Sequence, residues 1–265
     1  DFRASATYNK TFNNTHIINL YGGMSVNKID RHNTWFRGWG LQYDMGMEPY
    51  YDYLAFKQGM ESGSKYYTIG DSFYREVAFF FNGTYSYKGR YTINGTYRYE
   101  GTNKMGKSRK ARWLPTWNIS GAWNVHEEKF FSHVQPALSH LSLKASYSLT
   151  ADRGPSYVTN SLAVIKASTP WRPTSGDTET GLKVSSLENA QLTYEKKHEL
   201  NLGLDVGFVN NRINLAFDWY KRNNFDLIGT VTTQGIGGEI SKYGNVAEMK
   251  SNGVEISLST KNVQT

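Results

Sequence analysis

The stretch Tyr91-Thr-Ile-Asn-Gly-Thr-Tyr-Arg-Tyr-Glu100 alternates between two kinds of residue at every step. Apolar residues or glycine occupy the odd positions, and hydroxyl, amide or charged residues occupy the even positions. Successive side chains of a β-strand point to opposite faces of the sheet, so a period of two is typical of a strand. The stretch therefore predicts a strand with one apolar and one polar face.

The same pattern recurs on both sides of this stretch. Residues 77–87 alternate in the same way, and Lys88-Gly89-Arg90 joins the two runs, which predicts a β-hairpin. Residues 200–208 and 213–220 form a second such pair around Asn210-Asn211-Arg212. Further strands are predicted at Phe2–Tyr8, Thr15–Val26, Trp117–Val125, Leu141–Leu149 and Val254–Leu258, which gives nine strands in all.

The connections between these strands are of two kinds, short and long, which alternate along the chain. Short turns are predicted near residues 10–14, 88–90 and 210–212, and long loops rich in Gly and Trp at 27–72, 101–112, 151–192 and 223–252. An up-and-down order of strands places all short turns on one rim and all long loops on the other. The connection at residues 126–140 is long, although it falls on the rim of the short turns. Phe130, Phe131 and Pro136 predict a compact ordered turn there, with a helical piece.

Composition excludes several classes of protein. Aromatic residues make up 15% of the 265 residues, which is far too many for a disordered segment. We find no run of roughly 18 apolar residues, the length that a membrane-spanning helix needs. The chain has no Cys, so it contains neither a disulfide nor a Cys-based zinc site. The net charge of +7 is spread along the chain and does not indicate a nucleic-acid partner.

Strands of about ten residues with this loop asymmetry are typical of an all-β transmembrane antiparallel up-and-down barrel. Tyr and Trp are expected near both membrane interfaces, and Tyr85, Tyr87 and Tyr91 flank one turn, while Tyr97, Tyr99, Trp113 and Trp117 lie toward the opposite strand ends. An odd number of strands does not close a barrel of the usual even kind, so the chain is expected to be a segment of a larger barrel. A soluble β-sandwich, with its apolar face turned inward, shows the same alternation and stays open as the alternative.

Several motifs resemble the SusC/RagA family of TonB-linked outer-membrane proteins. The first two are the quoted stretch, continued to Gly101, and Arg112-Trp-Leu-Pro-Thr-Trp-Asn-Ile-Ser-Gly-Ala-Trp-Asn-Val-His-Glu-Glu128. Residues 143–150, 194–205 and 245–255 are similar to later strands and turns of that family, in the same order.

The resemblance implies a barrel of roughly 22 strands with an N-terminal plug, in the outer membrane of a Gram-negative bacterium. Residues 1–265 would form part of the C-terminal barrel domain, without the plug, the TonB-interacting motif or the last strands. It further implies active import of nutrient oligomers, either oligosaccharides or oligopeptides, driven by the TonB complex beneath a SusD-like surface lipoprotein. A dimer of transporter–lipoprotein pairs is one assembly that fits this family.

The long loops hold the candidate substrate or lid contacts. Aromatic faces beside hydrogen-bonding groups can stack on sugar rings or hold peptides, although aromatic residues also pack long loops internally. The alternative of a soluble or surface-attached glycan-binding module rests on these same side chains. The candidates are Trp35, Arg37, Trp39, Tyr43, Trp171 and Arg172.

No motif indicates an enzyme or a bound cofactor. His126, His133 and His140 match no zinc spacing, so we assign no metal ligand. Arg98, Glu100, Asp205 and Asp218 are predicted on the polar face, where they either select what passes or pair across strands. Three Asn-x-Ser/Thr motifs, at Asn82, Asn94 and Asn118, fall within strands on the polar face and are interpreted as polar groups of the barrel interior.

Overall fold

The computed structural model describes residues 1–37, 41–42, 46, 48–49, 53–62, 64, 66–105, 109–135, 137–154, 163–168, 181–235 and 238–261. Two compact units divide the chain. One contains residues 1–27, 76–164 and 184–265, and the other contains residues 28–75 and 165–183. No helix among the described residues is long and apolar enough to cross a bilayer.

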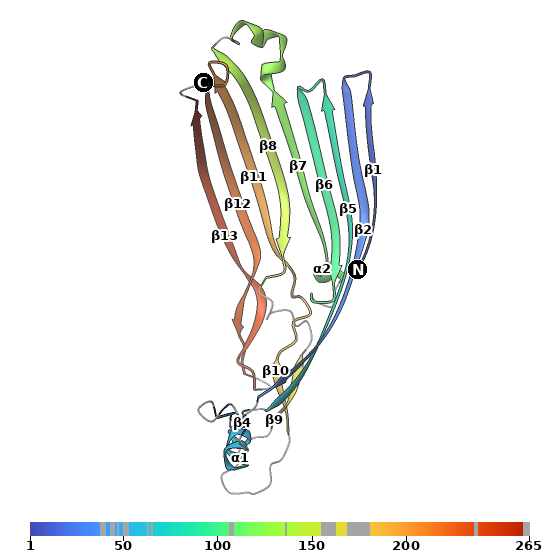
Figure 1. Cartoon of the computed structure of the whole chain (residues 1–265), viewed down its shortest axis with the longest axis vertical. Coiled ribbons are helices and arrows are strands. Elements are labelled where there is room, and N and C mark those ends of the chain that lie inside the picture. The colour runs from blue at the N-terminus through green and yellow to red at the C-terminus, as the bar shows by residue number, and fades with distance from the viewer. Residues whose placement is uncertain are drawn as a thin grey trace. The chain divides into compact units, whose positions relative to one another are not determined.

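Nine long strands form one antiparallel sheet (Figure 1). They are β1 (Phe2–Phe12), β2 (His16–Phe36), β5 (Tyr67–Tyr87), β6 (Tyr91–Thr102), β7 (Trp113–Asn124), β8 (Leu138–Asp152), β11 (Glu195–Phe208), β12 (Ile213–Thr232) and β13 (Ser241–Thr260). Their order in the sheet is their order in the chain, which confirms the predicted up-and-down fold and its nine strands.

The remaining elements are short and lie in the connections. They are β3 (Leu41–Gln42), β4 (Glu48–Pro49), α1 (Tyr53–Glu61), α2 (Arg109–Arg112), η2 (Val125–Glu127), η3 (Lys129–His133), β9 (Val164–Ser168) and β10 (Gly181–Ser186). β3 pairs with β4 and β9 pairs with β10, each as a small two-stranded sheet.

Tight turns join the strands at one rim of the sheet, which is the upper end in Figure 1. The turn between β1 and β2 has Asn13 at φ 47° and Asn14 at φ 51°, a left-handed conformation that hairpin turns use and that Asn tolerates. The next turn places Lys88 at φ 51° and Gly89 at φ 70°. The predicted division into short turns and long connections is therefore confirmed.

Two of the predicted long loops are wrong in their limits. Much of 27–72 and 223–252 is strand, because β2 continues to Phe36, β5 begins at Tyr67, and β12 and β13 stay paired as far as Thr232 and Ser241. Backbone hydrogen bonds form whatever the side chains are, so β2 remains a strand beyond Val26, where the regular alternation of apolar and polar residues has ended. The register between β12 and β13 shifts near residues 224–228, which marks an irregularity inside this extension.

The long turn between β7 and β8 is compact, as predicted. It consists of the two 3₁₀ turns η2 and η3, with Val125 and Phe131 buried. Of the two adjacent phenylalanines, Phe131 packs inward and Phe130 is exposed.

Candidate functional site

The apolar face of the nine-stranded sheet is exposed. Apolar side chains from β5 to β13 keep large exposed fractions, for example 59% for Ile119, 44% for Leu202 and 66% for Ile256. No second sheet covers this face in the described part of the chain, because the other two sheets have only two short strands each. Sheets in water bury such a face, so this exposure is a property to be explained by the surroundings of the protein.

Aromatic residues border the apolar face at two levels. Near the tight turns, Tyr91 and Trp123 are opposite each other on β6 and β7, and their rings stack with centroids 6.2 Å apart. Toward the loops, Tyr99 and Trp113 stack at 5.0 Å. Tyr91 and Tyr99 are eight residues apart on one strand, which corresponds to about 26 Å. Two aromatic belts about this far apart are typical of a membrane barrel wall.

The opposite face is polar, and its side chains hydrogen-bond across strands. Asn94 donates to Thr84 Oγ1 at 2.6 Å and Asn82 donates to Thr96 Oγ1 at 3.3 Å, between β5 and β6. Asn118 is opposite both Thr96 and Ser148 in the register. The three Asn residues of the Asn-x-Ser/Thr motifs therefore belong to the polar face of the sheet, as predicted.

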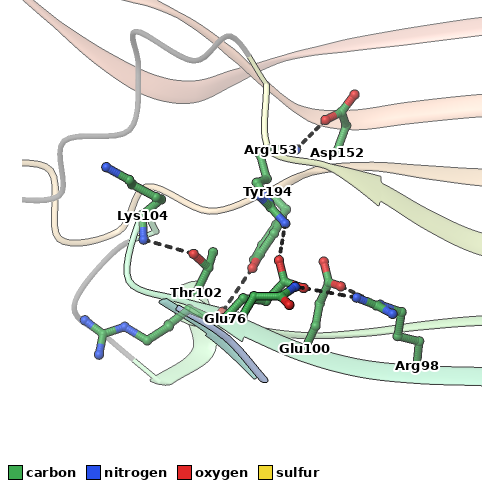
Figure 2. Close-up of polar contacts among 10 residues, drawn as sticks. Glu76, Arg98, Glu100, Thr102, Lys104, Asp152, Arg153 and Tyr194 are labelled. Atoms are coloured by element: carbon green, nitrogen blue, oxygen red, sulfur yellow. Dashed lines mark hydrogen bonds and ion pairs between the residues drawn. The ribbon is translucent and has the colours of Figure 1, made fainter. Parts of the chain in front are cut away.

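A charged cluster occupies the loop end of this polar face (Figure 2). Glu76, at the centre, is 7% exposed and accepts hydrogen bonds from Arg98 at 3.3 Å and Arg153 at 2.5 Å. The Arg98 Nε also donates to Glu100 at 2.5 Å, and the Asn27 side-chain amide donates to Glu76 at 3.4 Å. Three strands and the segment after β8 are thus tied together by one buried carboxylate.

A small apolar core lies next to the charged cluster. Met105, Leu114 and Tyr194 are almost fully buried and contact one another, with Ala151 packed against them. The Tyr194 hydroxyl donates to the Arg112 carbonyl oxygen at 3.4 Å, so the one polar atom of this side chain has a partner. This core fixes the connection between β6 and β7 against the start of β11.

The predicted polar-face residues have different surroundings. Arg98 and Glu100 pair with each other within the charged cluster, whereas Asp205 forms an ion pair with Lys144 on the neighbouring strand β8. Asp218 lies opposite Gly203 and Glu255, and it lines a hollow of about 330 Å³ on the polar face together with Thr92, Asn94, Ser146 and Asn201.

The sequence analysis missed Glu76 and Arg153. Glu76 continues the alternation of Ala78, Phe80 and Asn82 by one step, so this pattern could have placed it on the polar face. Arg153 follows β8, and only the register of the sheet brings it to Glu76, from which it is separated by 77 residues.

Two of the candidate loop contacts fall in the described part of the chain. Trp35 lies near the end of β2 with 46% of its surface exposed, and the Arg37 guanidinium lies 4.9 Å from the centre of its ring. The Arg37 backbone N–H donates to the Tyr66 carbonyl oxygen at 2.8 Å, which fixes this pair at the base of the connection. Trp39, Tyr43, Trp171 and Arg172 lie outside the described residues.

The structure brings only two of the three spaced histidines together. The rings of His126 and His140 are 4.1 Å apart, while His133 is exposed and its Nδ1 is 3.3 Å from the Phe130 carbonyl oxygen. Among the described residues, no three or more His, Asp or Glu side chains are grouped so that they could hold a metal ion.

Glu128 joins the compact turn to the sheet. Its carboxylate accepts hydrogen bonds from the Tyr91 hydroxyl at 2.6 Å, the Arg90 guanidinium at 3.1 Å and the Trp123 indole N–H at 3.4 Å. The hydrogen bond from Tyr91 is the main reason why the pKa of the Glu128 carboxyl lies below its usual 4.5.

We expect the contribution of Glu128 to stability to depend on pH. A carboxyl whose pKa is lowered in the folded state stabilises the fold above its unfolded-state pKa, and this stabilisation disappears as the pH falls through the folded-state pKa. Glu128→Gln should therefore lower the melting temperature at pH 7, and the difference from the wild type should shrink as the pH falls below 4.5. Thermal melting of the full protein in detergent, at pH 7 and pH 3, measures this. Glu127→Gln, a change at a neighbouring carboxylate that is 56% exposed, is the control.

Comparison with known proteins identifies the family. The family model described as "TonB dependent receptor-like, beta-barrel" matches residues 1–262. TonB-dependent receptor P3 of Formosa agariphila is 26% identical over 262 residues, which cover 97% of this chain and 24% of that protein. TonB-dependent receptor SusC of Bacteroides thetaiotaomicron is 29% identical over 161 residues, covering 60% of this chain and 16% of SusC.

Solved structures show the same fold. The RagAB peptide importer in its open-open state superimposes with a TM-score of 0.78 at 23% identity, covering 98% of this chain and 27% of the matched chain. The siderophore receptor PirA of Pseudomonas aeruginosa gives a TM-score of 0.53 at 13% identity and covers 97% of this chain. The chain spans about a quarter of the length of two curated relatives from Formosa agariphila, TonB-dependent receptors P3 and P26. It belongs to the TonB-dependent receptor-like β-barrel family, which confirms the resemblance found in its sequence.

Proposed function

We propose that this chain forms part of the wall of an outer-membrane β-barrel that imports nutrient oligomers. The observation that carries the proposal is the two-faced sheet: nine antiparallel strands expose apolar side chains on one face and place hydrogen-bonded polar groups on the other. Lipid takes the place of a hydrophobic core against the first face, and the second face lines an aqueous interior.

The family supports this proposal. Members are named TonB-dependent receptors, and the fold matches the RagAB peptide importer. On this basis we propose that the whole protein is driven by the TonB complex through regions outside residues 1–265, and works with a SusD-like surface lipoprotein. Both oligopeptides and oligosaccharides fit the proposal, and residues 1–265 would lie within one C-terminal barrel domain.

The exposed apolar face counts against a soluble β-sandwich. A sandwich would cover side chains such as Ile119 and Ile256 with a second sheet, and the described residues place none there. A soluble glycan-binding module would also not explain why aromatic residues border the apolar face at two levels.

Fractionation of the native cells tests the proposal. An antibody to this segment should detect a protein much larger than 30.1 kDa in the outer membrane, and its mobility on a gel should change on boiling, because barrels stay folded in cold detergent. Loss of uptake of labelled oligopeptides or oligosaccharides in a deletion strain, and in a strain without TonB, would support active import. Recovery of the protein in the soluble fraction would contradict the proposal.

Trp35 and Arg37 are proposed as substrate or lid contacts, and Trp35 gives a direct test. Trp35→Ala should raise the half-saturating substrate concentration for uptake about two- to tenfold, because an aromatic contact is worth about 0.5–1.5 kcal/mol. Phe36→Ala is the matched control, since Phe36 is the next residue of β2 and is also an exposed aromatic side chain. An equal effect of both variants, or none from Trp35→Ala, would contradict the assignment.

A further inference from the structure

The exposed apolar face has a hollow near the tight turns. Its volume is about 640 Å³, and its lining includes Ile93, Gly121, Leu143, Ala145, Leu202 and Phe217. The register explains it: Ile93, Gly121, Ala145 and Leu202 are successive cross-strand partners on β6, β7, β8 and β11. Two small residues between two large ones leave a groove in an otherwise filled surface.

Tyr91 and Trp123 border the groove on the side of the tight turns. Both line the groove, while the Tyr91 hydroxyl and the Trp123 indole N–H donate to Glu128 in the turn beyond. An aromatic side chain with an apolar body and a polar tip is typical of a membrane–water interface. These two residues therefore indicate where the hydrocarbon ends and the headgroup region begins.

The turns beyond this boundary carry an excess of positive charge. Lys88, Arg90, Lys129 and Arg212 lie in the turns that end β5, β7 and β11, against the two carboxylates Glu127 and Glu128, of which Glu128 is paired with Arg90 at 3.1 Å. The Lys88 ammonium nitrogen lies 5.1 Å from the centre of the ring of Tyr87, and Tyr87 is the cross-strand partner of Tyr91. Cations at a membrane surface attract anionic headgroups.

We propose that the groove is a binding site for one anionic phospholipid. One acyl chain occupies the hollow over Gly121 and Ala145, and the phosphate lies among the cations of the turns. This inference rests on the proposed placement of the sheet in a membrane. A second copy of the chain fits less well, because a symmetric pair meeting at this groove would bring two positively charged sets of turns together.

Gly121→Leu fills the groove without disturbing the sheet. A Cβ at position 121 would meet only the Thr92 carbonyl oxygen, at 3.9 Å, which is an ordinary contact. Gly95→Leu is the matched control. Gly95 is on the neighbouring strand β6 and the same face, a Cβ there would meet nothing within 4 Å, and it does not line the groove.

Native mass spectrometry of the full protein, purified in mild detergent and titrated with palmitoyl-oleoyl phosphatidylglycerol, measures the binding. We expect one phosphatidylglycerol per wild-type barrel, binding at least tenfold weaker to Gly121→Leu, and binding unchanged in Gly95→Leu. Phosphatidylcholine with the same acyl chains should bind more weakly than phosphatidylglycerol to the wild type.

Each other result overturns the proposal in a recognisable way. Unchanged binding to Gly121→Leu, or equal loss in Gly95→Leu, excludes the groove as the site. Equal binding of the two lipids excludes recognition of the anionic headgroup, and a change in the mass of the assembly without a change in bound lipid indicates a second copy. If the wild type proves water-soluble, the proposed function fails as well. A heat-modifiable membrane protein with unchanged lipid binding overturns the lipid site alone.

Discussion

Leu202→Arg is expected to impair assembly of the protein in the outer membrane. Leu202 is 44% exposed in the middle of β11, on the apolar face. An Arg on the lipid face costs about 2–4 kcal/mol at the centre of the bilayer and less toward its surfaces. A cost of about 2 kcal/mol already lowers the ratio of folded to unfolded protein roughly thirtyfold. The amount of heat-modifiable protein in the outer membrane measures the effect.

The adjacent residue provides the control. Asn201 lies on the opposite face of the same strand, where it donates to Ser146 Oγ at 3.4 Å. Asn201→Arg would place its charge on the polar face and should leave assembly nearly unchanged. Equal losses for both variants would show that the two faces of β11 do not differ in their surroundings.

Glu76→Ala is expected to be the most damaging change on the polar face. Its carboxylate is 7% exposed between Arg98 and Arg153, so its removal leaves two guanidinium groups without their shared partner. Removing one partner of a buried ion pair costs about 3–5 kcal/mol, but both arginines are more than a third exposed and water screens part of this. We therefore expect a loss of about 2 kcal/mol, measured by urea unfolding of the full protein in detergent.

Glu100→Ala separates the role of the cluster from a general effect of removing charge. Glu100 pairs with Arg98 only through the Arg98 Nε, on the same strand. Its removal leaves the contacts of Glu76 with Arg98 and Arg153 in place, so the loss should be less than half that of Glu76→Ala. Similar losses for the two variants would contradict the central role of Glu76.

The alternation was sufficient to predict the strands and their order, because it records that the two faces of the sheet have different surroundings, but a soluble sandwich would show the same alternation. In β6, the odd-numbered residues from Tyr91 to Tyr99 lie on the apolar face and the even-numbered residues from Thr92 to Glu100 lie on the polar face, so the alternation there is regular. The pattern fails at residues 27–36, where Lys28, Asp30 and Arg31 place charges on both faces of β2. β2 continues there beside β5 through backbone pairing, which leaves no trace in hydropathy.

The charged cluster was less predictable than the fold. Arg98 and Glu100 were assigned to the polar face from their positions, but the partners of Arg98 depend on the register between β5 and β6. The histidines show the same limit: the register of β8 brings His140 to His126, and equal spacing in sequence does not bring His133 with them. A period of two in the sequence assigns each residue to one face of the sheet. It does not predict which residues distant in sequence contact each other, because that depends on the register and on the course of the turns.

The central claim is that the apolar face contacts lipid and the polar face contacts water. Residues 1–265 contain no Cys, so single cysteines can be introduced into this segment. Any native cysteine elsewhere in the full protein would be replaced by Ser. We would label cysteines at Ser146, Tyr147, Asn201 and Leu202 with bimane, in the protein reconstituted in vesicles. The account predicts quenching by nitroxide-labelled lipids at 147 and 202, and by aqueous iodide at 146 and 201. Quenching by iodide at all four positions, without quenching by the lipids, would contradict the barrel wall.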